Sequence, residues 1–170
     1  MQSTKAFAPA NISCIFVIKK GKKSEKSGSL GLGFTVNKGV FATIKKIPIT
    51  KKSNIKKIKN NIIYFNNKKI NFPTVNSVIE KLTNEPVQVN IKSELPLGCG
   101  FGISGASALA VAYTLNELLN LKKSKKALAM IAHIAEVKNC TGLGDVVNQY
   151  YGGFLVKYDS SYKFKVKKFP

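Results

Sequence analysis

A glycine- and serine-rich stretch, residues 96–109, has the residue types best suited to chemistry in this sequence. It reads PLGCGFGISGASAL, with glycines at positions 98, 100, 102 and 105 and a serine at position 104. Glycine lets several backbone N–H groups converge without obstruction by side chains. A helix that follows such a loop adds free N–H groups and the positive end of its dipole. The stretch therefore predicts a site for a multiply charged anion, and we expect this anion to be a nucleotide phosphate.

Two acidic residues could complete such a site. Glu136 closes an alanine-rich helical segment, and Asp145 follows a Gly-Leu-Gly turn. Phosphoryl transfer requires a divalent ion at the phosphates and a carboxylate that orients and deprotonates the acceptor hydroxyl. One carboxylate with Ser104 could bind magnesium while the other acts as the base. Spacing alone leaves an equal alternative, in which Glu136 pairs with a lysine and Asp145 caps the next helix. The other six acidic residues lie in polar or lysine-rich surroundings typical of surface charges: Glu25, Glu80, Glu85, Glu94, Glu117 and Asp159.

Other polar residues carry weaker signals. The glycine loop is not a Walker A motif, because it lacks the Gly-Lys-Ser/Thr ending. It is not a dinucleotide-binding fingerprint either, because the acidic residue expected further along the chain is absent. His133 lies one turn before Glu136 on the same helix face, a position more typical of a structural histidine. Asn11 and Ser13 are expected to be loop caps. The glycines at positions 28, 31 and 33 indicate either a close ligand approach or a bent strand.

The elements that must position these residues follow from the apolar pattern. Hairpin turns are expected at residues 37–39, 66–67 and 159–161, and a surface excursion at residues 45–61. Helices are predicted over residues 74–82, with Thr74 as the cap, over 106–121, and over 124–137. Together they predict an α+β fold, a mixed β-sheet with helices packed on one face. The expected strands are residues 12–18, 28–36, 40–44, 62–65, 68–71, 86–91, 153–158 and 162–168.

The net charge of +20 raises the question of nucleic-acid binding. All 28 basic residues are lysine, whereas sequence-specific readers favour arginine for bidentate contacts to guanine and phosphate. The lysines occur in runs typical of exposed loops, at residues 19–26, 51–59 and 122–126. We therefore favour a solvated lysine-rich surface over a dedicated nucleic-acid patch.

Length and cysteine content are those of a reduced, soluble domain. The 170 residues suffice for one core, and no apolar run approaches the ~20 residues of a membrane span. The N-terminal region, with Pro9 and Asn11, does not resemble a signal peptide, so we expect a cytoplasmic protein with no membrane partner. Cysteines at positions 14, 99 and 140 indicate neither a disulfide framework nor a zinc site.

The ordered set of motifs resembles the GHMP kinases, the family of galacto-, homoserine, mevalonate and phosphomevalonate kinases. PLGCGFGISGA at 96–106 is similar to their phosphate-loop motif. Glu136, GLGD at 142–145 and YGGF at 151–154 resemble the family's downstream acidic segment, in the same order. Within the family, PxxIxxxF at 9–16, GSLGLG at 28–33 and AHIAE at 132–136 are similar to the archaeal pantoate kinase branch.

This resemblance implies ATP- and magnesium-dependent phosphorylation of the primary hydroxyl of pantoate to 4-phosphopantoate, a step of coenzyme A biosynthesis. By matching positions, Ser104 and Glu136 would bind Mg²⁺, and Asp145 would act as the base. The triphosphate would be held by Pro96, Gly98, Cys99, Gly100, Gly102, Ser104, Gly105 and Ala106. The residues assigned to the substrate are Asn11, Gly28, Ser29, His133 and Thr141.

The sequence departs from the family pattern at three positions, and the resemblance also has implications for the domain organisation. Phe101 and Ile103 replace a leucine and a serine of the family loop, and Asn11 replaces the histidine usual in the pantoate branch. Residues 1–170 would form the N-terminal, ATP-binding domain, with a left-handed βαβ crossover. The family normally adds a second domain of comparable size with a third glycine-rich motif. The sequence contains no such domain, so we expect it on a longer product or a separate polypeptide, with a homodimer as a further option.

Our preferred hypothesis is therefore the N-terminal half of a pantoate kinase. One alternative is another small-alcohol kinase of the same family, of homoserine or shikimate type. A second, from a different class, is a non-catalytic nucleic-acid-binding module that uses the lysine surface. Magnesium–ATP binding that depends on Ser104 separates the first two from the third, which would bind oligonucleotides with a steep salt dependence.

Overall fold

A computed structural model describes residues 4–47 and 61–170 as a seven-stranded mixed sheet with four helices. The long strands β1 (Thr4–Lys19) and β2 (Gly28–Lys46) run antiparallel along the whole molecule. One half of β2 also pairs with β5 (Val87–Ser93), and the other half pairs with β6 (Phe154–Lys157). The sheet order is β4-β3-β5-β2-β6-β7, with β1 against β2. The outer strands are β3 (Ile62–Phe65), β4 (Lys68–Lys69) and β7 (Val166–Phe169).

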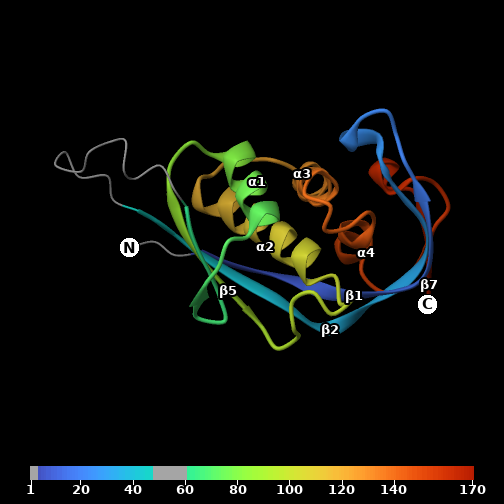
Figure 1. Ribbon diagram of the computed structural model, residues 1–170, viewed down its shortest axis with the longest axis horizontal. Helices are drawn as coiled ribbons and strands as arrows, with labels where there is room; N and C mark the ends of the chain where they lie inside the picture. The colour runs from blue at the N-terminus through green and yellow to red at the C-terminus, as the bar shows by residue number, and fades with distance from the viewer. Residues whose placement is uncertain (1–3, 48–60) are drawn as a thin grey trace.

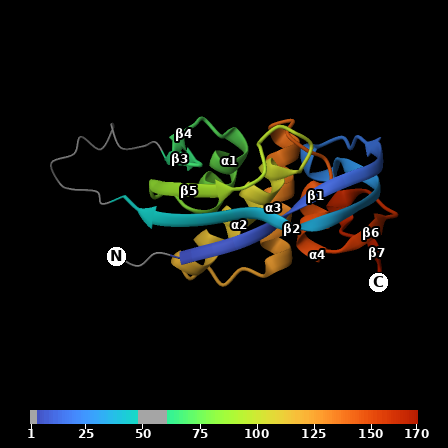
Figure 2. The same ribbon diagram turned by 90° about the horizontal axis from the view of Figure 1, so that it is seen from below.

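The helices cover one face of this sheet, as Figure 1 shows. They are α1 (Pro73–Leu82), α2 (Ile103–Leu118), α3 (Lys125–Lys138) and α4 (Asp145–Tyr151). Helix α2 lies between the sheet and the other helices, so it is apolar on nearly all sides. Two short 3₁₀ turns, η1 (Ser24–Lys26) and η2 (Ser161–Lys163), lie in the connections. Seen from below, β1 and β2 lie in front of the helices (Figure 2).

The predicted α+β class and mixed sheet are confirmed. Strands β3 and β5 run parallel, with α1 between them in the chain, and the other strand pairs are antiparallel. The turn at Asn66 and Asn67 has positive φ angles of 47° and 67°, as a tight hairpin requires. Ser124 caps α3 by accepting a hydrogen bond from the Ala127 N–H at 3.2 Å. Most of the expected surface excursion lies outside the described residues.

Several local predictions were wrong. Residues 37–39 form no hairpin turn, because β1 continues opposite them and absorbs residues 37 and 38 in a bulge of β2. The region around Asn11 is strand rather than loop, since β1 begins at Thr4. Thr74 is not the cap of α1, because the helix starts at Pro73 and Phe72 occupies the cap position. The Thr74 hydroxyl instead lies 2.9 Å from the Thr141 hydroxyl. Helix α2 begins at Ile103, three residues before the predicted start.

Candidate active site

The glycine-rich stretch forms an open loop that leads into α2. Gly98, Gly100 and Gly102 have φ angles of 81°, 80° and 60°, a region that favours glycine. A Cβ atom added at Gly98 or Gly100 would meet no atom within 4 Å, so the loop backbone is open to an approaching ligand. The amides of the first turn of α2, including that of Ser104, have no partner within the helix. This end of α2 therefore offers convergent N–H groups and positive dipole charge to an anion.

Neighbouring elements hold the end of this loop in place. The Asn11 backbone N–H in β1 donates to the Phe101 carbonyl at 3.0 Å. The Gln149 Nε2 group in α4 donates to the Gly102 carbonyl at 2.7 Å. Because both bonds end on the last residues before α2, they fix the start of the helix relative to β1 and α4.

A cavity of about 1010 Å³ lies in front of the loop. Its walls come from the loop itself, the 140–145 turn, the start of α1 and the ends of β1 and β2. This volume matches the upper range of small-molecule sites and can hold a nucleotide beside a small acceptor. Among the predicted site residues, those that line it are Gly98, Gly100, Gly102, Ser104, Ser29, Thr141 and Asp145.

Ser104 and Glu136 meet beside the loop. The Ser104 hydroxyl donates to Glu136 Oε1 at 2.6 Å. Glu136 is fully buried, and its other oxygen, Oε2, has no hydrogen-bond partner among the described residues. Burial, reinforced by the nearby Asp145 charge, raises the pKa of Glu136 to about 8. A buried carboxylate with an unpaired oxygen is a group that a cation would stabilise.

Asp145 lies at the first position of α4, on the cavity wall. Its Oδ1 accepts hydrogen bonds from Asn11 Nδ2 at 2.7 Å and from the Ser13 hydroxyl at 3.3 Å. Burial raises the pKa of Asp145 above its ordinary value, while Lys157 and these two donors oppose the shift. Both hydrogen bonds end on Oδ1, so Oδ2 remains the oxygen that can accept a proton. Asn11 and Ser13 are thus partners of Asp145 rather than the loop caps that we predicted.

Sequence reasoning missed a buried cation behind Asp145. Lys157 is 2% exposed, and its Nζ donates to Asn148 Oδ1 at 3.0 Å. Asn148 Nδ2 in turn donates to Asn11 Oδ1 at 2.7 Å, which links Lys157 to the partner of Asp145. Gly144 and Ser29 line the cavity, and a Cβ added at Gly144 would lie 3.2 Å from Nζ, so the ammonium lies close behind this part of the cavity wall. Strand alternation could have found it, because Lys157 shares the inward face of β6 with the buried Leu155.

The remaining predicted residues lie around this centre without lining the cavity. His133 is fully buried, and its Nε2 donates to the Ser27 carbonyl at 3.1 Å, just before Gly28 and Ser29. Burial lowers the pKa of His133, so the ring is neutral. Gly28 is covered by Ser160 and Ser161. Pro96 and Cys99 point to solvent, and Gly105 and Ala106 are buried within α2.

The residues present fit a magnesium–nucleotide complex better than a protein-only metal cage. Within the part of the chain that the structure describes, no group of three or more histidine, cysteine or acidic side chains converges. Mg²⁺ usually takes one or two carboxylates and leaves its other positions to phosphate and water. Glu136 and Ser104 supply that number of ligands next to the phosphate loop.

Comparisons with known proteins agree with this geometry. The sequence model of a family described as "GHMP kinases N terminal domain" matches residues 69–153. The chain is 39% identical over 166 residues to the pantoate kinase of Methanocaldococcus jannaschii, covering 95% of this chain and 56% of that protein. A solved structure described as a phosphotransferase related to the CoA biosynthesis pathway has a TM-score of 0.81 and 30% identity, covering 94% of this chain and 54% of its own. The solved structure of a homoserine kinase from Cytophaga hutchinsonii has a TM-score of 0.70 and 26% identity, and the match covers 100% of this chain and 52% of that one.

The chain spans about half the length of the curated relatives it matches. No helix among the described residues is long and apolar enough to cross a bilayer.

Proposed function

Because the chain belongs to the GHMP kinases, we propose that it is the ATP-binding half of a pantoate kinase, which transfers the γ-phosphoryl group of ATP to the primary hydroxyl of pantoate. The observation that carries this proposal is the meeting of three groups at one cavity. These are the open phosphate loop, the Ser104–Glu136 pair and the Asp145 carboxylate. Phosphoryl transfer is mostly positioning and electrostatics, and these groups supply both.

The loop and the start of α2 would hold the phosphates. The backbone N–H groups between Gly98 and Gly105 would bind phosphate oxygens, and the α2 dipole favours the negative charge. The Ala106 N–H cannot contribute as predicted, because that group donates to the Gly102 carbonyl at 3.0 Å. Mg²⁺ bound by Ser104 and Glu136 would neutralise charge on the phosphate oxygens. The Ser104–Glu136 hydrogen bond would give way to this ion, which also supplies a partner for the unpaired Glu136 Oε2.

Asp145 would act as the base toward the acceptor hydroxyl. Its raised pKa makes it a stronger base than an exposed aspartate, and the nearby Lys157 favours its charged form. Asn11 and Ser13 both donate to Oδ1 and so hold the carboxylate at the cavity wall, with Oδ2 free of these two bonds. The hydroxyl proton would pass to Asp145 as the new O–P bond forms, while the bond between the γ-phosphorus and the bridging oxygen breaks and ADP leaves with that oxygen.

Lys157 is the best candidate within this chain for recognition of the substrate carboxylate, since all 28 of its basic residues are lysine. It is a buried cation with no acidic partner within salt-bridge distance among the described residues, and it lies directly behind Ser29 and Gly144. A carboxylate bound beside Ser29 would compensate this charge. His133 would act indirectly, by holding Ser27 and thus the start of β2.

The domain assignment is part of the same proposal. Residues 1–170 would form the N-terminal GHMP domain, and the β3–α1–β5 connection would be the family's left-handed crossover. The curated relatives are about twice as long, so we infer that a second domain, on the same or another polypeptide, completes the enzyme.

Calorimetric titration with Mg–ATP tests the nucleotide site without requiring turnover. We expect binding by the chain and at least a roughly tenfold loss of affinity in Ser104→Ala, because one metal ligand is removed. Phosphorus NMR with pantoate, homoserine or shikimate as acceptor then identifies the product. Asp145→Asn should retain Mg–ATP binding and lower any turnover by roughly 10²–10⁴-fold. If Mg–ATP fails to bind while oligonucleotides do so with a steep salt dependence, the kinase proposal fails and the nucleic-acid module is favoured.

A further inference from the structure

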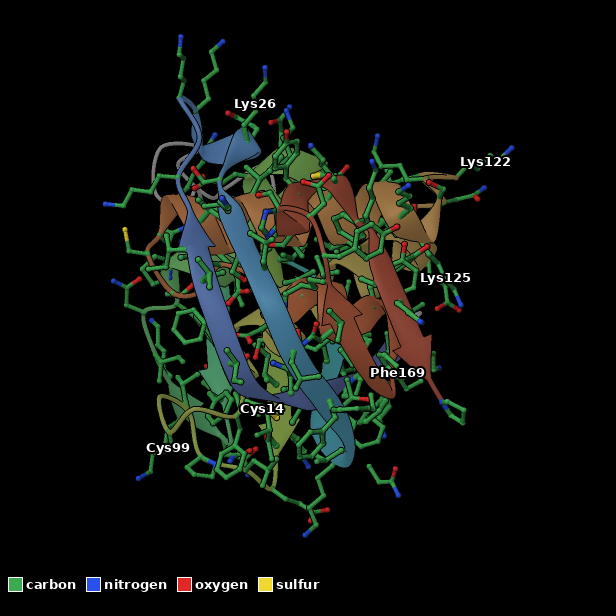
Figure 3. All side chains as sticks on the ribbon, turned by 90° about the vertical axis from the view of Figure 1, so that its right-hand side faces the viewer. Cys14, Lys26, Cys99, Lys122, Lys125 and Phe169 are labelled. Carbon is green, nitrogen blue, oxygen red and sulfur yellow. The ribbon has the colours of Figure 1, made fainter. Side chains whose placement is uncertain are left out.

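A buried row of polar side chains connects Lys157 in β6 to the Asp145 carboxylate by way of α4 and β1. We call it the amide relay: Lys157, Asn148, Asn11 and Asp145. Lys157 Nζ donates to Asn148 Oδ1 at 3.0 Å, and Asn148 Nδ2 donates to Asn11 Oδ1 at 2.7 Å. Asn11 Nδ2 then donates to Asp145 Oδ1 at 2.7 Å. Strands β1, β2 and β6 lie side by side in Figure 3, and α4 packs against β1 and β2.

The ammonium at one end fixes the direction of the amide relay. An ammonium group only donates hydrogen bonds, whereas an asparagine side chain donates from its nitrogen and accepts at its oxygen. Lys157 therefore requires the oxygen of Asn148, which turns the Asn148 NH₂ group toward Asn11. Asn11 receives that bond on its own oxygen and presents its NH₂ group to Asp145. Reversing either amide would place two donors or two acceptors face to face, which is costly for buried groups.

Both asparagines are shielded from solvent, so water cannot compensate for a reversed amide. Asn11 and Asn148 are fully buried, and Lys157 is 2% exposed. Gly33 in β2 leaves the room that the two amides occupy, because a Cβ added there would lie 2.5 Å from Asn148 Nδ2 and 3.4 Å from Asn11 Oδ1. The close approach that we predicted for the glycines at residues 28–33 is therefore made, at Gly33, by the protein's own side chains.

Asn148 acts on Asp145 only through Asn11. The two residues lie three positions apart in α4, on one face of the helix. Within the described ranges, however, the Asn148 side chain bonds to Lys157 and Asn11 and not to Asp145. Asp145 Oδ1 accepts from Asn11 and from the Ser13 hydroxyl. Its shorter bond, to Asn11, is thus the one whose direction depends on the amide relay.

We propose that Asn148 is a positioning residue for Asp145, which transmits the donor-only character of Lys157 through Asn11 and so keeps an N–H group on Asp145 Oδ1. This inference rests on the proposed role of Asp145 as the base. A base must lie within hydrogen-bond reach of the hydroxyl that it deprotonates, and small displacements of a reacting group are costly. A reversed Asn11 amide would turn its oxygen toward Asp145 and displace the carboxylate.

NMR of the ¹⁵N-labelled full chain tests the amide relay without requiring turnover. In the natural chain, the NH₂ groups of Asn11 and Asn148 should exchange with solvent at least about 100-fold more slowly than that of the exposed Asn120. Asn148→Asp places an acceptor-only group beside Lys157, which favours its ionised form. The Asn11 NH₂ group should then turn from Asp145 toward position 148, and its resonance should move. Any turnover should fall roughly 10–100-fold, with Mg–ATP affinity within about twofold of the natural value.

Asn116→Asp is the matched control, because it makes the same change of charge in a helix away from the amide relay. Asn116 Oδ1 accepts from the Lys123 backbone N–H at 2.9 Å, and an aspartate can keep that bond. This variant should leave the Asn11 resonance and any turnover unchanged. Asp145→Asn should move the Asn11 resonance, which verifies that the signal reports on the contact with residue 145.

Three results would overturn the proposal. The first is solvent exchange of either buried NH₂ group as fast as that of Asn120, which the natural chain alone decides even if Asn148→Asp does not fold. The second is an Asn11 resonance that a folded Asn148→Asp leaves in place, with circular dichroism melts as the measure of folding. The third is unchanged turnover in that variant. Failure of the kinase proposal is distinguishable, because Mg–ATP would then fail to bind the natural chain while its NH₂ groups remained protected.

Discussion

Two carboxyl groups, one fully buried and one half-buried, define the site at the residue scale. Glu136 is fully buried with one unpaired oxygen, whereas Asp145 lies on the cavity wall with two donors on one oxygen. Desolvation raises the pKa of both, but only Asp145 has a nearby cation, Lys157, that opposes the shift. The two environments thus differ: Glu136, with a pKa of about 8, offers an unpaired oxygen to a metal ion, whereas Asp145 has a cation and two donors that favour its charged form.

The raised pKa of Glu136 predicts a particular pH dependence of stability. Between its ordinary value of 4.5 and about 8, the unfolded carboxyl is ionised while the folded one keeps its proton. The folded state binds more protons, so this group's contribution to the free energy of unfolding is fully present below pH 4.5 and is lost as the pH rises toward 8. In metal-free solution, Glu136→Gln should therefore leave stability at pH 5 nearly unchanged and raise it at pH 8 by roughly 1–3 kcal/mol.

Urea denaturation at the two pH values measures this difference. Adding Mg²⁺ and ATP supplies the control, because the ion should stabilise the natural chain at pH 8 and have much less effect on Glu136→Gln. A variant less stable than the natural chain at pH 8 would show that Glu136 is ionised and satisfied in the folded state.

Lys157 offers a second residue-scale prediction. Lys157→Met keeps the length of the side chain but removes the cation that lies behind Ser29 and the hydrogen bond to Asn148. A substrate carboxylate would lose a charged partner, and we expect weaker pantoate binding by roughly 10–100-fold with Mg–ATP affinity unchanged. Titration with each ligand measures the two affinities, and Lys165→Met, at an exposed lysine nearby in the sequence, is the matched control. Equal loss of both affinities would instead indicate general damage to the fold.

At the scale of elements, glycines set how closely the turn at 140–145 approaches α3. A Cβ added at Gly142 would lie 2.6 and 2.7 Å from the two Glu136 carboxylate oxygens. Gly142→Ala should therefore displace Glu136 or the turn and weaken Mg–ATP binding at least about tenfold. Gly100→Ala is an informative comparison, because an added Cβ there meets nothing within 4 Å and only the φ of 80° opposes it. That strain costs about 1–2 kcal/mol. If thermal melts and titrations give both variants the same behaviour, the packing argument for Gly142 is wrong.

Local signals predicted most elements but not the long strands. The start of α3 near Ser124, the Asn66-Asn67 turn and the apolar pattern of α2 are encoded within a few residues, so the sequence sufficed to predict them. The break predicted at residues 37–39 failed because a neighbouring strand, 30 residues earlier in the chain, carries the pairing through a bulge. Turn propensity is local, whereas bulges depend on the partner strand.

The candidate site shows the same difference between local signals and contacts of distant segments. The loop, Ser104, Glu136 and Asp145 were identified from motif order, and the fold brings them together. Asn11, Ser13, Asn148 and Lys157 form their network through contacts between β1, α4 and β6. Such contacts between distant segments leave no pattern in a single sequence. Only the inward position of Lys157 on β6 had a local signature, its alternation with Leu155.

At the scale of the whole molecule, charge is the dominant unusual feature. The chain has 28 lysines against eight acidic residues, and its ion pairs within the described ranges are mostly between exposed side chains. Such pairs contribute little, so mutual repulsion of lysines destabilises the compact state. Raising NaCl from about 0.02 to 0.5 M shortens the screening length to a few ångströms and should raise the melting temperature by several degrees.

The stability of the fold depends on the position of each charge as well as on the net charge. Two substitutions in α3 separate these two effects. Its first turn carries Lys125 and Lys126 and no acidic residue, although a helix N-terminus favours negative charge. Lys126→Glu should stabilise the fold by about 0.5–1 kcal/mol at low salt, through both lower net charge and the helix dipole. Lys138→Glu makes the same change in net charge at the other end of α3, where Lys138 lies 3.7 Å from Glu25. It should be neutral or destabilising, because the helix C-terminus and Glu25 both favour a cation. Equal stabilisation by the two variants in calorimetry at low salt would show that net charge alone governs stability.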